Sequence, residues 1–121
     1  MEQTAKTEWV IPDMYWPEIT SGRNYVSHES VCVLNTGERD CEVRITLYYE
    51  DSDPVALQPA RCDAMRTHHI RMDRIRDMAG APVRRGVPYA ARVLCSVPVT
   101  VQYTRVDTSE STNAIMTTMA R

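Results

Sequence analysis

The sequence lacks any apolar run long enough to cross a membrane. No stretch of about 18 consecutive apolar residues occurs. Residues 1–9 carry Glu2, Lys6 and Glu8 where a secretory signal would place a basic and then an apolar segment. These absences predict a soluble, cytoplasmic protein.

Cysteine and glycine are sparse, and their spacing excludes several kinds of site. No two of the four cysteines form a Cys-x-x-Cys pair, so the sequence favours buried, reduced thiols over a zinc or redox pair. The four glycines have no phosphate-loop spacing, and neither a Gly-x-Ser-x-Gly motif nor an identifiable Cys-His-acid set occurs. The sequence therefore predicts a protein that is not an enzyme and has no cofactor.

Positive charge is concentrated in one region. Residues 61–92 hold eight Arg and three Asp, a local charge of +5 in a chain whose net charge is −2. A nucleic-acid surface would combine such charge with interleaved aromatics, whereas this region contains only Tyr89 and the calculated pI is 5.9. Composition thus argues against nucleic-acid binding.

The dominant pattern is alternation of apolar and polar residues, bounded by Pro, Gly, Asn and Asp, which indicates antiparallel strands. We expect strands at residues 8–11, 26–34, 41–49, 55–57, 65–72, 89–96 and 97–106, with 114–120 as a strand in preference to a short helix. Residues 12–25 read as a loop, 73–78 as one helical turn, and Pro98 as a strand divider. Seven or eight short strands in 121 residues predict one all-β domain spanning 1–121, an antiparallel β-sandwich or jelly roll.

Polar residues on these strands suggest a binding pocket. His69 and Arg71 share one strand face, and Gln102 both donates and accepts hydrogen bonds, as a hydroxyl-rich ligand requires. His28 and Glu29 are adjacent, so on a regular strand they face opposite ways and only one of them lines a pocket.

A metal centre is the alternative that His28, Glu29, His68 and His69 leave open, because they supply the ligand types of a cupin-like site. Against it, no His-x-His spacing occurs, and His68 and His69 point to opposite faces.

Four motifs occur in order along the chain: residues 27–35 (SHESVCVLN), 46–49 (TLYY), 66–71 (RTHHIR) and 102–107 (QYTRVD). With the C-terminal residues 113–120 they cover most of the chain, and together they resemble the sensory rhodopsin transducer family. The resemblance implies a small β-sandwich protein that assembles as a homotetramer, with a membrane photoreceptor as partner in the namesake and a small-molecule, carbohydrate-related ligand in the wider family. It also implies that ligand-binding positions are His28, Glu29, Arg66, His69, Arg71, Gln102, Arg105, Asp107 and Asn113.

Three functions are weighed on this basis. The leading hypothesis is a non-enzymatic domain that binds a sugar or sugar derivative, with Glu29 and Arg71 bridging hydroxyl pairs and Gln102 fixing orientation. The second is an adaptor that docks on a membrane receptor or a DNA-bound regulator through residues 61–92. The third is a metal-dependent sugar isomerase or epimerase that uses His28, Glu29 and His69.

Overall fold

The computed structural model describes residues 5–18, 26–108 and 114–121. This part of the chain contains eight strands and no helix, which confirms the all-β prediction. The strands are β1 (Lys6–Tyr15), β2 (His28–Asn35), β3 (Cys41–Tyr49), β4 (Val55–Ala56), β5 (Ala60–Cys62), β6 (Arg66–Arg71), β7 (Pro88–Asp107) and β8 (Ala114–Met119).

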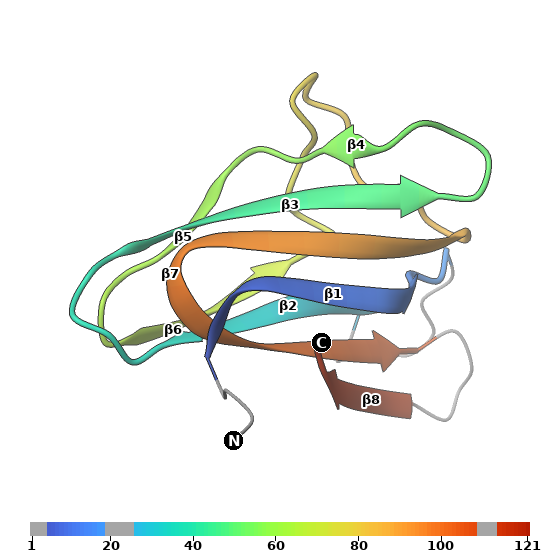
Figure 1. The fold of residues 1–121 in the computed structure, drawn as a ribbon. Coiled ribbons are helices and arrows are strands. Elements are labelled where there is room, and N and C mark those ends of the chain that lie inside the picture. Colours follow the sequence, from blue (N-terminus) through green and yellow to red (C-terminus); the bar gives the residue numbers. More distant parts are fainter. Residues whose placement is uncertain (1–4, 19–25, 109–113) are drawn as a thin grey trace.

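The strands form two antiparallel layers that share β7 (Figure 1). In the first layer β3 pairs with β4, β5 and the first half of β7, and β1 pairs with the other edge of β7. In the second layer β2 lies between β6 and the second half of β7, and β8 pairs with the other edge of β7. We call these the first sheet and the second sheet.

The 20-residue strand β7 bends back on itself and so contributes to both sheets (Figure 1). Its last β3 partner is at Cys95 and its first β2 partner is at Thr100, so Pro98 falls where the strand changes layers. Proline has no N–H to donate, and this bend is a place where neither β2 nor β3 needs one. The prediction of two separate strands divided by Pro98 was therefore wrong.

Three other boundaries differ from the sequence predictions. Strand β1 continues past Pro12 to Tyr15, because a register shift between Ile11 and Met14 accommodates the residues that were expected to form a loop. Residues 73–78 form no helix, although the amides of Arg74 and Ile75 both donate to the carbonyl of Arg71 at 3.1 Å. The three-residue strand β5 was missed, whereas the C-terminal strand was predicted correctly.

The core lies between the sheets and follows the predicted alternation. Val43, Ile45 and Leu47 of β3 are buried, while the residues between them are more exposed. Across the layers they join the equivalent inward residues of β2 and β7, such as Val31 and Val101. Each fully buried side chain of this size contributes about 1.5–3 kcal/mol to stability.

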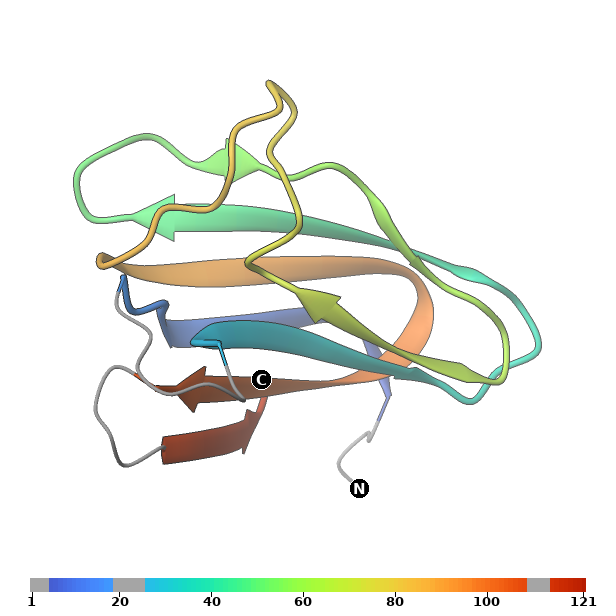
Figure 2. The ribbon, with the colours of Figure 1, turned by 180° about the vertical axis from the view of Figure 1, so that it is seen from behind.

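Both open sides of the sandwich are partly closed by short segments. On one side Arg121 exchanges backbone hydrogen bonds with Val10 of β1, which brings the C-terminal residues against the first sheet. On the other side the short turn between β5 and β6 joins the edges of the two sheets (Figure 2). Beyond that turn β5 and β6 diverge, and the candidate site lies there.

Candidate ligand-binding site

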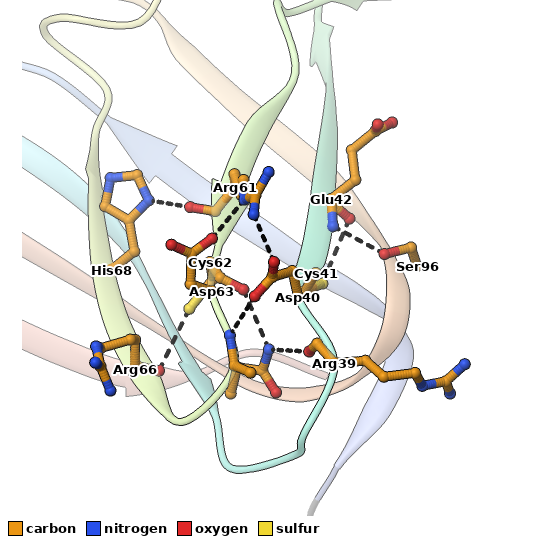
Figure 3. Close-up of polar contacts among 12 residues, drawn as sticks. Arg39, Asp40, Cys41, Glu42, Arg61, Cys62, Asp63, Arg66, His68 and Ser96 are labelled. Atoms are coloured by element: carbon orange, nitrogen blue, oxygen red, sulfur yellow. Dashed lines mark hydrogen bonds and ion pairs between the residues drawn. The ribbon is translucent and has the colours of Figure 1, made fainter.

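A polar cluster fixes the turn where β5 meets β6 (Figure 3). The guanidinium of Arg61 donates to Asp40 at 2.5 Å and also to Asp63, and the amide of Ala64 donates to Asp40 at 2.8 Å. The imidazole Nδ1 of His68 lies 2.6 Å from the carbonyl oxygen of Arg61 and so bridges the two strands. These contacts hold the narrow end of the gap between β5 and β6 closed.

Next to this bridge the gap widens into a pocket of about 480 Å³. Its walls come from residues 58–60 before and within β5, from residues 68–71 of β6, and from the turn at 74–76. We call it the Arg74 pocket. Its volume falls in the range of small-molecule sites, which is about 300–1,000 Å³.

The charged residues of the Arg74 pocket are all basic. Arg71, Arg74 and Arg76 line it, and none of its lining residues is an aspartate or glutamate. Arg71 is already neutralised, because its Nε and Nη2 each donate to Asp73 at 2.8 Å. Burial opposes ionisation of Asp73, yet these hydrogen bonds from Arg71 hold the pKa of Asp73 below its ordinary value.

The other two arginines of the pocket, Arg74 and Arg76, form fewer side-chain hydrogen bonds than Arg71. Arg76 donates one hydrogen bond, from Nη1 to the carbonyl of Gly80 at 3.1 Å. Arg74 is exposed, and its guanidinium has no acceptor among residues 5–18, 26–108 and 114–121. Arg74 therefore presents an uncompensated positive charge at the pocket.

The edge of β6 adds backbone groups to the same pocket. The amide of Met72 donates to the carbonyl of Glu29 at 2.9 Å, which sets the alternation of the β2–β6 ladder. By that alternation the N–H and C=O of Ile70 point to β2, and those of His69 point outward to the gap. The pocket thus combines a free cation with one strand-edge donor and acceptor.

A second hollow of about 470 Å³ adjoins the first and shares Pro59 and Ala60 with it. Its arginine, Arg61, is held by Asp40 and Asp63, and Asp40 and Glu42 also line it. Because these charges already satisfy one another, this hollow has less to offer a charged ligand than the Arg74 pocket.

Glu29 occupies a different place, inside the sandwich. Its carboxylate is fully buried and accepts a hydrogen bond from the Tyr15 amide at 2.8 Å, one from the Tyr89 hydroxyl at 2.5 Å and one from the Tyr103 hydroxyl. Arg105 lies 3.9 Å from the same carboxylate and donates to the Tyr103 hydroxyl at 2.9 Å. We call these five residues the Glu29 network.

The Glu29 network joins the two ends of β7, since Tyr89 belongs to the first sheet and Tyr103 to the second. Burial, followed by the charge of Glu29 and the hydrogen bond to it, raises the pKa of both tyrosines above the ordinary value of 10.0. The hydroxyls therefore stay protonated and act as donors. The buried carboxylate accepts three hydrogen bonds and has the Arg105 guanidinium nearby, so the network holds the two layers together.

The sequence-predicted residues do not converge on one site. His69 and Arg71 line the Arg74 pocket, whereas Glu29 and Arg105 belong to the interior network. The expectation that Glu29 and Arg71 jointly bridge a ligand is wrong, because Glu29 lies with the inward residues of β2 and Arg71 pairs with Ser30 on the opposite face.

The remaining predicted residues do not line the Arg74 pocket, although Gln102 shares the row of His69 across Cys32. His28 is partly exposed and its Nδ1 lies 2.7 Å from the Val26 carbonyl; Gln102 lies opposite Cys32 on the outer face of the second sheet. Arg66 is exposed and donates to the Met65 carbonyl at 2.9 Å, and Asp107 ends β7. Asn113 lies outside the described residues.

The metal-ligand alternative finds no geometry in the described ranges. No group of three or more His, Cys, Asp or Glu side chains there is arranged to hold a metal ion. Glu29 and His69 in particular lie on different faces of the second sheet.

Sequence reasoning did not select Arg74, Gln58 or the two tyrosines as site residues. The arginine-rich composition of residues 61–92 was the one signal for Arg74. Nothing local marks Tyr89 and Tyr103 as partners of Glu29, because the contact depends on the bend of a strand 60 and 74 residues away.

Fold and pocket define a class: an antiparallel β-sandwich with a basic hollow at the junction of its sheet edges. Within the described part of the chain, no helix has the length and apolar character needed to cross a membrane. The family model described as Anabaena sensory rhodopsin transducer matches residues 4–121. The chain belongs to this family.

Two solved structures resemble the protein closely. Thermotoga maritima 1070 is 32% identical with a TM-score of 0.85, and the match covers 98% of this chain and 96% of that one. The Anabaena sensory rhodopsin transducer is 36% identical with a TM-score of 0.74, and the match covers 84% of this chain and 89% of that one. No curated protein matches the chain.

Proposed function

We propose that this protein is a cytoplasmic, non-enzymatic signalling domain that binds a small polar ligand, a sugar or sugar derivative, in the Arg74 pocket. The observation that carries the proposal is a hollow of about 480 Å³ in which a free guanidinium and a strand edge meet. Such a set of convergent polar groups in a formed cavity is typical of small-molecule sites.

The pocket also contains the apolar surface that a sugar ring requires. Pro59 and Ile75 contribute carbon surface, and Gln58 and the backbone of His69 stand beside them. A pyranose has apolar C–H faces and hydroxyls around its rim, so both kinds of surface are used. Glu29 has no direct part in this version, because its oxygens are occupied inside the sandwich.

Calorimetry and thermal denaturation against a panel of sugars, sugar acids and sugar phosphates test this proposal. A ligand at 100 times its dissociation constant stabilises the folded state by about 2.7 kcal/mol, which is readily seen as a rise in Tm. Failure of every panel member to raise Tm at millimolar concentration would contradict the proposal.

A partner protein is the second candidate, as an adaptor in a homotetramer. The matched relative is named for transducing the signal of a sensory rhodopsin, which suggests a membrane photoreceptor as partner here. Arg84 is engaged by Asp51 and Arg85 stacks on Trp16, so the available docking charge of this region includes Arg74 and Arg76, which both line the pocket.

Charge-reversal variants distinguish the adaptor function from the ligand-binding function. A protein carrying Arg74→Glu and Arg76→Glu is expected to lose capture of the receptor, and capture by the wild type should weaken with salt. The matched control is Arg44→Glu with Arg92→Glu on the outer face of the first sheet, which should leave capture unchanged. Capture that survives the first pair of substitutions excludes docking through this surface.

A further inference from the structure

We infer that the ligand of the Arg74 pocket carries an acidic group, a carboxylate or a phosphate, and that Arg74 receives it; this rests on the proposed ligand-binding function. Neither the family nor the resemblance assigns a charge to the ligand. The inference comes from how the charges around the pocket are already paired.

The charges along the pocket wall do not balance. Three arginines line the Arg74 pocket without any acidic lining residue. Asp73 lies next to the wall, but its carboxylate already forms a bidentate salt bridge with Arg71. The net charge left at the pocket is therefore positive, whereas a site for a neutral sugar has no need of an unbalanced guanidinium.

Several other arginines of the same region already have carboxylate partners. Arg61 is held by Asp40 and Asp63, Arg84 by Asp51, and Arg92 by Glu8. The guanidinium of Arg74 has neither a carboxylate nor a carbonyl acceptor within the described ranges, whereas Arg66 donates to the carbonyl of Met65 and Arg85 stacks on Trp16. A ligand oxyanion would supply the acceptor that the Arg74 guanidinium lacks.

Further N–H donors lie around the pocket. Arg76 uses Nη1 for the carbonyl of Gly80 and keeps its other guanidinium N–H groups. The outward N–H of His69 lies on the facing wall. An oxyanion between these walls would accept charge-assisted hydrogen bonds, which are about twice as strong as neutral ones.

The pocket also offers contacts for the non-acidic part of the ligand. Pro59, Ala60 and Ile75 supply carbon surface, and the carbonyl of His69 supplies an acceptor for a hydroxyl. The site is thus suited to a compact molecule with an acidic end and a hydroxylated body, as in sugar acids and sugar phosphates.

The test compares glucose, glucuronate, glucose 6-phosphate and inorganic phosphate by calorimetry at low and moderate salt. We expect an acidic sugar to bind at least about tenfold more tightly than glucose, the factor that corresponds to one charge-assisted hydrogen bond. Binding of glucuronate alone identifies a carboxylate, binding of glucose 6-phosphate alone identifies a phosphate, and either result supports the inference.

The variant Arg74→Gln is expected to lower that affinity about tenfold while leaving Tm unchanged, because the side chain of Arg74 is exposed and only its backbone amide, which the substitution keeps, donates a hydrogen bond within the fold. Arg74→Lys should recover part of the loss, and Arg44→Gln, in an exposed pair on the first sheet, should have no effect.

The possible failures are distinguishable. Glucose binding as tightly as the acidic sugars, with Arg74→Gln unaffected, overturns the inference and leaves the proposed sugar-binding function standing. Binding of inorganic phosphate alone, equally in the wild type and Arg74→Gln, also overturns the inference. Binding of no probe contradicts both.

Discussion

A buried carboxylate is tolerated only where donors surround it, and Glu29 obtains its donors from widely separated parts of the chain. Its partners are the Tyr15 amide, the Tyr89 and Tyr103 hydroxyls and, at 3.9 Å, the Arg105 guanidinium. These groups come from β1 and from both halves of β7, so all three segments must be placed correctly. The network therefore contributes to the choice of one packing of the two sheets over others.

Replacement of Glu29 by Gln should destabilise the protein by about 2–3 kcal/mol, because the amide presents N–H groups to a site built of donors. Urea unfolding monitored by tryptophan fluorescence measures the change. Glu42→Gln breaks only an exposed pair with Arg44 and should cost at most about 1 kcal/mol. Equal stability of the two variants would contradict the role assigned to Glu29.

Alkaline pH should reveal the same network. Burial and the charge of Glu29 raise the pKa of Tyr89 and Tyr103, so in the folded protein these two remain protonated when ordinary tyrosines ionise. Their contribution to stability is present below the unfolded pKa of 10.0 and is lost as the pH rises through the raised values of the folded state.

The measurement is tyrosinate absorbance between about pH 9 and 12, recorded with and without urea. In the native protein two tyrosines should be missing from the transition centred near 10, and they should appear on unfolding. Complete ionisation of a still-folded protein in a single transition would contradict the burial of these hydroxyls.

At this scale the sequence predicted the direction of side chains but not their partners. Strand alternation correctly separated His28 from Glu29 and placed His69 beside Arg71. It did not reveal that Glu29, and not His28, points into the core. A buried carboxylate needs hydrogen-bond donors, and its donors Tyr89 and Tyr103 are distant in the sequence.

Among the elements, the turn between β5 and β6 determines the shape of the pocket edge. Met65 lies in this turn with φ 57°, and it is the one non-glycine residue with a positive φ in the described ranges. The side chain is 69% exposed, so packing does not compensate for the unfavourable backbone.

Met65→Asn should therefore stabilise the protein by about 0.5–1 kcal/mol, because asparagine adopts the left-handed conformation more readily than methionine. The matched control is Met78→Asn, since Met78 is 64% exposed and has an ordinary backbone. Thermal denaturation of the two variants gives the answer. A gain for both, or for neither, would show that the backbone conformation of Met65 is not the source of strain.

Strands in which buried and exposed residues alternate along the whole length were predictable from the sequence. Strands that change their pairing partner partway along were not. The prediction for β3 matched Cys41–Tyr49 because one set of residues faces the core along its whole length. The continuity of β7 depends on where β3 ends and β2 begins to pair, at Cys95 and Thr100, and Pro98 marks that bend without indicating whether the strand continues through it. Pro12 and Pro98 were correctly taken as irregularities but not as points inside continuous strands.

For the molecule as a whole, the reactivity of three buried cysteines indicates whether the sandwich is folded. All four are free; Cys41, Cys62 and Cys95 are buried, whereas Cys32 is partly exposed on the second sheet. Burial raises the pKa of Cys95 to about 12, so its reactive thiolate form is scarce at neutral pH.

Reaction with Ellman's reagent at pH 8 should show one faster thiol, Cys32, and three that react only as the protein unfolds. Cys32→Ser should remove the faster phase and leave the slow one, whose rate should rise with urea. Four thiols that react together in native protein would contradict the closed core.

Pairing with carboxylates removes about half of the positive charge that the sequence concentrates in residues 61–92. Arg61, Arg71, Arg84 and Arg92 each pair with a carboxylate, and two of the four arginines left without one, Arg74 and Arg76, line the Arg74 pocket. Composition located the charge, but only the fold separates paired from unpaired arginines.

The most direct measurement of the central claim is a two-dimensional amide NMR titration of the protein with glucuronate and with glucose 6-phosphate. We expect saturable shifts at Ala60, His69 and Arg74, which line the pocket, and none at Val10 and Leu94 on the outer face of the first sheet. Shifts that map to that outer face, or no saturable shifts with either compound, would contradict the Arg74 pocket as the binding site.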